Sequence, residues 1–428
     1  MKIATQISFS NWESFIAAHP DGSVFQSPEM FELFEMTGKF EPLVLGACDD
    51  EGALCGILLG VFIHERRGPW KLLSSRFVVY GGPLLGGDED RKRSCLDALL
   101  QELVERTRKK ALFIQFRNFF DWQEYREVFE KHGFAYLERL NYIIGVRGPS
   151  ASLRTGKGYG GRGTGTGNHA ISNSPPPVGG GREGAEDREP KTEDHTISNS
   201  PPPVGGGREG AAGGEAGSRI NVLQNMSTSR RRQIRKGLAS GAVIIEPQNM
   251  DQLREFYAIL SDLYRHKVRK PLPGRPFFEN FYNLTSPRPP HPARSEAEIP
   301  PWRDTRTPIG IIRLVKYGDR IIGGILAPVT PGKCIYEWYV CGLDKEYKDQ
   351  YPSVLATWAA IDYAIRNEIE SFDFMGVGKP GKPYGVREFK ARFGGETVNY
   401  GRFTRINNKF LYHIAELGYN VLALVKKI

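Results

Sequence analysis

The sequence predicts an α/β fold that is built twice along one chain. Strand-like apolar runs alternate with amphipathic helical segments over residues 1–148, and the same alternation returns over residues 219–397. This is the pattern of helices packed on a sheet. The 428 residues allow two to three domains of roughly 150 residues each. With 40% hydrophobic and 11% aromatic residues, each unit has enough apolar side chains for its own core.

In the first unit, apolar spacing and capping residues indicate the elements. A helix near residues 10–19 precedes a second helix entered through Ser27-Pro28, which supplies an N-cap and a proline at the first helical position. A long helix over 88–110 carries apolar residues at helical spacing, namely Leu96, Leu99, Leu100 and Leu103. The remaining expected elements are strands at 42–48, 53–63, 76–83, 111–118 and 135–146 and a helix at 124–132. We expect residues 398–428 to complete this unit.

The two units are separated by a segment, residues 149–218, that does not have the composition of a folded domain. Residues 151–218 hold 18 of the 49 glycines and seven of the 29 prolines, with Tyr159 as the only aromatic residue. Such a chain cannot bury enough apolar surface to offset the entropy of ordering it, so we expect it to be disordered. Residues 169–185 and 195–211 are a near-exact duplication with a period of 26 residues, which reads as low-complexity duplication.

The second unit begins with a basic helix. We expect a helix capped by a Ser or Thr among residues 227–229 and ended at Gly237 or Gly241. Its first turns carry Arg230, Arg231, Arg232 and Arg235. A positive face of this kind favours a phosphate-bearing partner such as tRNA, or it is simply a solvated face; the sequence leaves both open. A long helix ending before Pro271, strands around a Tyr317-Gly318-Asp319 turn and a helix at 353–368 follow, with a short polar insert at 286–307.

Residues 372–395, FDFMGVGKPGKPYGVREFKARFGG, have the character of a site. A strand-like start runs into a turn rich in glycine and proline, where a ligand can approach the main chain. Lys390 then lies between Phe389 and Phe393, and a partly desolvated cation acts strongly on a developing negative charge. The alternative is a surface turn followed by an edge strand with Lys390 and Arg392 in solvent.

Further polar and aromatic residues are candidates for binding a substrate. Arg265, at the end of the long helix, could clamp an anion bidentately, although a surface arginine explains it equally well. Tyr339 lies in an aromatic strand, where such residues more often pack a core. The candidate substrate-binding residues are Arg265, Tyr264, Tyr339, Asp373, Tyr384, Arg387 and Arg392.

The order of several segments resembles the Fem family of peptidoglycan interpeptide-bridge aminoacyltransferases. The segments are RRRQIRKGLASGAVI, YRHKVRKPLPGRPFF, IIGGILA, YPSVLATWAAIDYAI, FDFMGVG and GVREFKARFGG, with VFQSPEM and YGGP in the first unit. The resemblance implies two tandem domains of the GNAT acyltransferase type. It also implies transfer of an amino acid from aminoacyl-tRNA to an amine of a lipid-linked or nucleotide-linked peptidoglycan precursor, in cell-wall biogenesis and the maintenance of cell shape, without metal or cofactor.

The resemblance also assigns roles to particular residues. Phe389 and Lys390 match a pair beside the reacting carbonyl, whose lysine stabilises the tetrahedral oxyanion, and Arg265 matches an arginine that contacts substrate phosphate. Phe34 stands where members acting on nucleotide-linked muramyl peptides carry lysine, and Arg117-Asn118 stands where they carry Asp-Pro, so the acceptor stays open. The alternatives are an N-acyltransferase of envelope polysaccharide or lipid synthesis that uses acyl-CoA, and a non-catalytic RNA-binding protein.

Charge, cysteine content and segment hydrophobicity limit the partners and the cellular compartment of the protein. The net charge of +9 favours anionic partners without choosing among them. The five cysteines show no C-x-x-C pair, so neither a disulfide framework nor a zinc site is indicated. The first residues lack the apolar core of a signal peptide, so we expect a cytoplasmic protein. Residues 410–428 form either a packing helix or a basic amphipathic helix that contacts the inner face of the membrane.

Overall fold

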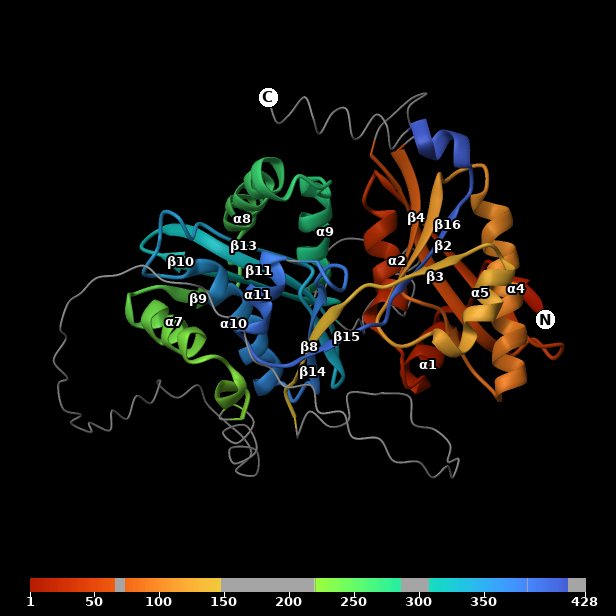
Figure 1. Ribbon diagram of the computed structural model, residues 1–428, viewed down its shortest axis with the longest axis horizontal. Coiled ribbons are helices and arrows are strands. Elements are labelled where there is room, and N and C mark those ends of the chain that lie inside the picture. Colours follow the sequence, from red (N-terminus) through yellow and green to blue (C-terminus); the bar gives the residue numbers. More distant parts are fainter. Residues whose placement is uncertain (66–73, 148–218, 220, 286–307, 383, 415–428) are drawn as a thin grey trace, which may run out of the picture. The chain divides into compact units, whose positions relative to one another are not determined.

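The computed structural model describes residues 1–65, 74–147, 219, 221–285, 308–382 and 384–414. The expectations for residues 149–218, 286–307 and 415–428 fall outside this part of the chain. The described residues form two mixed sheets with helices packed on them (Figure 1). The expected pair of α/β units is therefore confirmed.

The first sheet has the strand order β1-β2-β3-β4-β6-β16-β7, with β5 paired to β3. Its strands are β1 (Lys2–Ala4), β2 (Phe40–Cys48), β3 (Leu54–His64), β4 (Ser75–Gly81), β5 (Leu84–Leu85), β6 (Phe113–Asn118), β7 (Ala135–Leu137) and β16 (Arg402–Ile406). The helices α4 (Glu89–Thr107) and α5 (Arg126–Lys131) pack on one face, and α1 (Phe9–Ala18) and α2 (Pro28–Glu35) belong to the other (Figure 1). Leu96, Leu99, Leu100 and Leu103 are all fully buried, as the spacing predicts.

Local sequence explains where the first helices start. The Ser27 side chain accepts a hydrogen bond from the Met30 amide at 3.2 Å, and Pro28 occupies the first helical position of α2. Just before it, the short 3₁₀ helix η1 (Val24–Gln26) carries Gln26, a buried amide. Its side chain donates to the carbonyl oxygens of Tyr80 and Gly82, each at 2.9 Å. These bonds fix the end of β4, which borders the cavity described below.

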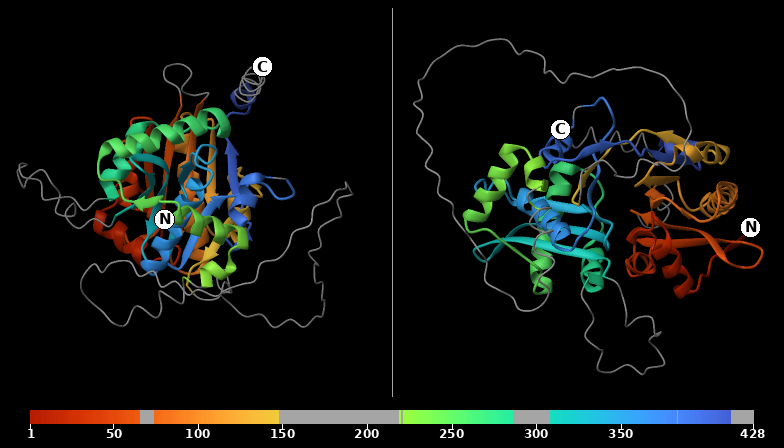
Figure 2. Two further views of the ribbon diagram at one scale, coloured as in Figure 1. Left: turned by 90° about the vertical axis from the view of Figure 1, so that its left-hand side faces the viewer. Right: turned by 90° about the horizontal axis from the view of Figure 1, so that it is seen from below.

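The second sheet has the order β15-β8-β14-β12-β11-β10-β9, with β13 paired to β11. Its strands are β8 (Asn141–Gly145), β9 (Val243–Ile245), β10 (Gly310–Tyr317), β11 (Arg320–Thr330), β12 (Cys334–Tyr336), β13 (Tyr339–Gly342), β14 (Ser371–Gly376) and β15 (Glu396–Val398). The helices are α7 (Thr228–Ala239), α8 (Met250–Leu263), a π-helical turn η5 (Tyr264–Val268), α9 (Arg275–Thr285), α10 (Pro352–Arg366) and α11 (Gly385–Ala391). One face of the sheet packs on α10 and α7, and the other on α8 and α9 (Figure 2).

The chain exchanges strands between the two halves. The segment 135–146, which the sequence presents as one strand of the first unit, is divided into β7 and β8, and β8 pairs with β14 and β15 in the second sheet. In return, β16 pairs between β6 and β7 in the first sheet. The boundary expected at residue 148 therefore differs from the structure. The reason is burial, because four of the five β8 residues are buried and need partners on both edges, whereas β7 is largely exposed.

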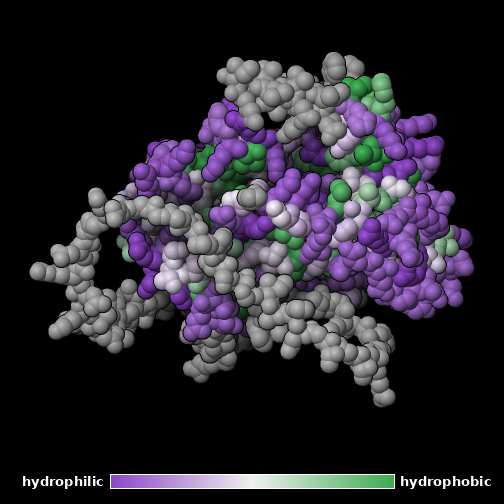
Figure 3. All heavy atoms as spheres, in the orientation of Figure 1, coloured by the Kyte–Doolittle hydropathy of each residue, from purple (hydrophilic) through white to green (hydrophobic). Residues whose placement is uncertain are grey.

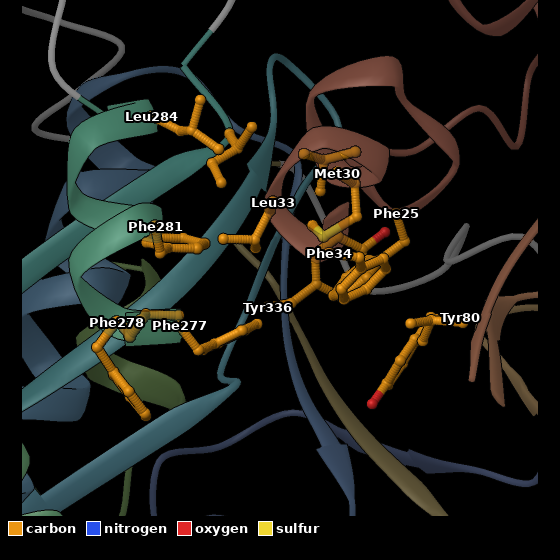
Figure 4. Close-up of a cluster of buried hydrophobic side chains, with 14 of the residues drawn as sticks. Phe25, Met30, Leu33, Phe34, Tyr80, Phe277, Phe278, Phe281, Leu284 and Tyr336 are labelled. Carbon is orange, nitrogen blue, oxygen red and sulfur yellow. The ribbon is translucent and has the colours of Figure 1, made fainter. Parts of the chain in front are cut away.

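One hydrophobic cluster joins the two halves. Phe25 packs against Tyr336 of β12 with 5.1 Å between ring centroids, and Phe40 packs against Phe277 of α9 at 5.6 Å. Figure 4 shows side chains from α2, η1 and α9 converging on this cluster. Hydrogen bonds cross at the same place, such as the one from the Asn280 amide to the Met36 carbonyl at 2.9 Å. The two sheets are thus held against each other by packed aromatic rings.

The outer surface in the view of Figure 3 is mostly hydrophilic where it is described. Across the described ranges, every helix is too short or too polar to cross a membrane.

Candidate active site

A cavity of about 730 Å³ lies between the two sheets and is lined by both. The first sheet contributes residues of β4, β6 and β16. The second half of the chain contributes residues of the turn between β12 and β13, and of β13, β14, α9 and α11. The lining residues used below are Arg76, Tyr80, Gln115, Arg117, Tyr264, Lys270, Glu337, Tyr339, Gly376, Lys390 and Arg402.

At the cavity wall, Lys390 forms a buried ion pair with Glu337. The Lys390 side chain is 10% exposed and that of Glu337 2%, with 3.1 Å between Nζ and Oε1. Lys390 Nζ also donates to the Phe374 carbonyl oxygen at 2.5 Å. The Thr357 hydroxyl of α10 donates to the other Glu337 oxygen at 3.1 Å. Both charged groups are therefore satisfied, as buried charges must be.

The electrostatics of this pair place a carboxylate with raised proton affinity, Glu337, next to the cation of Lys390. Burial raises the pKa of Glu337 above its usual range, although Lys390 and Thr357 oppose the shift. An ammonium group has three donors, and the contacts to Glu337 and Phe374 account for two of those of Lys390. Among the described residues, no further hydrogen bond uses the third donor, and Lys390 lines the cavity.

The sequence singles out Lys390 but misses Glu337. The run CIYEWYV, expected as one strand, is interrupted between β12 and β13, so that Glu337 leaves the regular pairing and turns to Lys390. The signal that could have found it is a single acidic residue in an otherwise aromatic and apolar run. The segment of Lys390 itself forms the helix α11, so the alternative of an exposed edge strand is wrong.

Phe389, the neighbour of Lys390, contacts a buried arginine instead of the cavity. The guanidinium of Arg230 lies 4.3 Å from the ring centroid of Phe389 and 4.2 Å from that of Phe393, and it donates to the Phe389 carbonyl oxygen at 2.8 Å. Burial and the nearby Arg392 lower the pKa of Arg230 to about 10. Arg230 is 2% exposed. It therefore fixes α11 from behind and does not belong to the solvated phosphate-binding face predicted for it.

The other basic residues of α7 remain accessible. Arg232 and Arg235 are exposed and Arg231 is half-buried. Arg231 and Arg235 border a hollow of about 460 Å³ together with Trp358. The predicted phosphate-binding set is thus reduced to these three arginines on the outer side of the helix.

The candidate substrate-binding residues separate into those that reach the cavity and those that do not. Tyr264 and Tyr339 line it, with 6.2 Å between their ring centroids. Burial raises the pKa of the Tyr264 hydroxyl to about 12, so the group stays a neutral donor. Arg265 is exposed on the π-helical turn and does not line the cavity.

Asp373 lies beneath the site and not in its wall. It is 2% exposed and accepts hydrogen bonds from the Met375 amide at 2.5 Å and from the Asn141 side chain at 3.3 Å. Burial raises its pKa to about 6. Met375 is held at φ 58, a conformation that costs about 1–3 kcal/mol for such a residue. Asp373 thus fixes a strained backbone at the end of β14, where the cavity begins.

Arg387 holds the loop between β14 and α11 through hydrogen bonds to its backbone. Arg387 donates to the carbonyl oxygens of Val377 at 3.1 Å and Lys379 at 2.5 Å. Tyr384 is an exposed residue at the start of α11, and Arg392 is exposed at its end. None of these three residues lines the cavity.

The N-terminus of α10 is occupied by a carboxylate. Asp344 accepts hydrogen bonds from the Ser353 amide at 3.0 Å and from the Ser353 hydroxyl at 2.6 Å. Helix N-termini commonly bind phosphates through such amides. Because a carboxylate already satisfies this one, a diphosphate would meet a negative charge there. Among the described residues, no cluster of three or more His, Cys, Asp or Glu side chains could hold a metal ion.

Comparison with known proteins identifies the fold first. The crystal structure of FemX is similar with a TM-score of 0.58 and 13% identity, covering 97% of this chain and 99% of the FemX chain. A tandem GNAT protein from the clavulanic acid biosynthesis pathway is similar with a TM-score of 0.47 and 8% identity, over 95% and 98% of the two chains. L-PGS from Bacillus licheniformis follows with a TM-score of 0.42 and 10% identity, over 99% of each chain. The chain thus has the FemX fold.

A family match covers part of the second unit. Residues 316–420 match the model of the FemAB family, and this segment contains both Glu337 and Lys390. The resemblance to the Fem family, read from the order of short segments, is confirmed by this match. No curated protein sequence matches the chain.

Proposed function

We propose that the protein is an aminoacyltransferase that moves an amino acid from aminoacyl-tRNA to an amine of a peptidoglycan precursor, as in interpeptide bridge formation. The observation that carries the proposal is the buried Lys390–Glu337 pair at the wall of a cavity lined by both sheets. The pair lies in the segment that matches the FemAB family.

The pair supplies the two functions that aminolysis of an ester requires. The acceptor amine forms a bond to the ester carbonyl carbon, and the carbonyl oxygen becomes an oxyanion. The remaining donor of Lys390 stabilises that oxyanion. The amine loses a proton to Glu337, whose raised pKa makes the carboxylate a better base. The bond between the acyl carbon and the ribose oxygen of tRNA then breaks, the carbonyl re-forms, and Glu337 returns its proton to the leaving oxygen, which becomes the ribose hydroxyl.

The remaining features support a nucleic-acid donor. Arg231, Arg232 and Arg235 present positive charge on one helix, and the chain carries +9 overall, which favours contact with phosphates of tRNA. We propose that neither a metal nor a cofactor takes part, because an activated ester needs only alignment and oxyanion stabilisation. The proposed setting is the cytoplasm, in contact with the inner face of the membrane when the precursor is lipid-linked.

The acyl-thioester alternative is less well supported. A coenzyme A diphosphate would have to bind without the N-terminus of α10, since Asp344 occupies it. The experiment below includes a thioester donor so that this alternative is measured directly.

The test is transfer of radiolabel from a mixed aminoacyl-tRNA pool to lipid-linked and nucleotide-linked muramyl peptides. Wild type is compared with Lys390→Met and Glu337→Gln, and the exposed Lys348→Met serves as the matched control for loss of a lysine. We expect transfer by wild type and the control and little by the two site variants. Circular dichroism checks that each variant is folded.

Two results would overturn the proposal. Consumption of acetyl-CoA with no use of aminoacyl-tRNA would make the protein a thioester-dependent acyltransferase. Tight, salt-sensitive tRNA binding without transfer of any label, and unaffected by Lys390→Met, would make it an RNA-binding protein.

A further inference from the structure

Two arginines from distant parts of the sequence lie side by side in the cavity. Arg117 of β6 and Arg402 of β16 are directly opposite each other in the antiparallel register, and both line the cavity. Like charges at opposed positions destabilise a sheet. The arrangement therefore calls for a compensating group.

No such group is found among the described side chains. Neither guanidinium forms an ion pair with a described carboxylate. Their partners are neutral: the Gln115 side-chain oxygen lies 3.2 Å from Arg117 Nε and 3.5 Å from Arg402 Nη1. The Tyr80 hydroxyl accepts from Arg117 at 3.4 Å, with the guanidinium 5.2 Å from the ring centroid. Both positive charges stay uncompensated within the described part of the chain.

The cavity as a whole has an excess of positive charge. Its lining contains six Lys or Arg residues and two Glu residues, Glu65 and Glu337. Glu65 pairs with Arg76 and Glu337 with Lys390. Four lining cations have no acidic partner within the described ranges, namely Lys39, Lys270, Arg117 and Arg402. Burial, followed by repulsion from Arg117 and Arg139, lowers the pKa of Arg402 to about 9.

The arginine pair lies close to the reacting groups. A Cβ built on Gly376 would come within 3.3 Å of Arg402 Nη2, so the guanidinium lies against the backbone at the end of β14. The carbonyl oxygen that holds Lys390 belongs to Phe374, two residues earlier in the same strand. Two strand residues span about 7 Å at most. A group bound by the arginines would therefore lie close to the backbone carbonyl that binds Lys390.

We propose that Arg117 and Arg402 form a subsite for a substrate oxyanion, a phosphate or a carboxylate, next to the Lys390–Glu337 pair. Two adjacent guanidinium forks provide parallel N–H donors that match the oxygens of such a group. Binding of an anion by the two arginines does not depend on the proposed function; only the identity of the substrate that carries the anion rests on it. A phosphate belongs to the terminal nucleotide of the donor, and a carboxylate belongs to the amino-acid part of the acceptor.

The test is isothermal titration calorimetry of the full chain with inorganic pyrophosphate and, separately, with malonate. We expect one of the two anions to bind, which identifies the source. Arg117→Gln and Arg402→Gln should each weaken that binding by about 10- to 100-fold. The exposed Arg108→Gln on α4 removes the same charge far from the cavity and should leave binding unchanged.

Thermal unfolding separates a binding role from a structural one. Removing one of two opposed cations should leave the melting temperature of Arg402→Gln unchanged or raise it. Absence of binding by both anions, or equal binding in wild type and both variants, would overturn the subsite, as would a large fall in melting temperature on Arg402→Gln. Anion binding is measured without turnover, so the subsite remains supported even if the protein transfers no aminoacyl group. Conversely, transfer that neither arginine variant affects would refute the subsite and leave the proposed aminoacyl transfer intact.

Discussion

The Lys390–Glu337 pair predicts a specific pattern of stability. At the 3.1 Å separation of Lys390 Nζ and Glu337 Oε1, two unit charges attract by about 5 kcal/mol at an effective dielectric constant near 20. This attraction offsets the cost of burying both groups. Lys390→Met removes it and leaves the carboxylate buried, and breaking a buried pair in this way costs about 3–5 kcal/mol.

The loss should depend on pH in a defined direction. Without Lys390, the pKa of Glu337 rises further above its already raised value, and a neutral carboxyl is tolerated in an apolar site. A carboxyl group whose folded-state pKa is raised contributes stability below its unfolded pKa and loses it as pH rises through the folded pKa. Lys390→Met should therefore be less destabilising at pH 5 than at pH 8, relative to wild type.

A double-mutant cycle measures the pair directly. Urea unfolding of wild type, Lys390→Met, Glu337→Gln and the double variant should show a coupling free energy of about 2–3 kcal/mol at pH 8, because Gln removes the buried charge that Met leaves unpaired. Lys348→Met should lie within about 0.5 kcal/mol of wild type. Additive single-variant effects, or a Lys390→Met variant as stable as wild type at pH 8, would refute the buried pair.

Three further predictions concern the framework of the site. The pKa of Asp373 is raised from 3.8 to about 6. Between pH 4 and 7, the wild-type free energy of unfolding should therefore fall by about 2–2.5 kcal/mol more than that of Asp373→Asn in urea titrations; parallel curves would contradict this. Arg230→Met should lower the free energy of unfolding by about 2–4 kcal/mol in the same assay, because the Phe389 carbonyl loses its charged donor and the Phe389 ring loses its cation. A change below about 0.5 kcal/mol would show that Arg230 is dispensable. Gly395→Ala should cost about 2 kcal/mol or more, since Gly395 has φ 108 and an added Cβ would lie 2.4 Å from the Ile143 carbonyl oxygen; an unchanged melting temperature would mean that the backbone relaxes there.

The sequence predicted the elements better than their assembly. Apolar spacing located α4 and the buried strands because those patterns are local. The return of residues 402–406 to the first sheet as β16 agrees with the expectation that residues 398–428 complete the first unit. The pairing of β8 with the second sheet was not predictable in the same way, since strand pairing depends on partners far apart in the chain. β8 is buried and pairs with a strand on each edge, and both features arise only in the assembled fold.

The site shows the same division. Lys390 was recognisable from the phenylalanines around it, but its partner Glu337 is 53 residues earlier and only folding brings the two together. Arg230 illustrates the opposite error, because a run of arginines on a helix does not reveal which of them faces the core. Arg117 and Arg402, separated by 285 positions, become a pair only through the register of β6 and β16.

Aminoacyl transfer by the Lys390–Glu337 pair can be measured as a single-turnover rate. Labelled aminoacyl-tRNA and the best acceptor are combined with wild type, Lys390→Met, Glu337→Gln or Lys348→Met. Loss of one oxyanion donor should slow the step by about 10²–10³-fold, and loss of the general base by about 10²–10⁴-fold. The Lys348→Met rate should match wild type. Folded site variants that transfer at the wild-type rate would contradict the account.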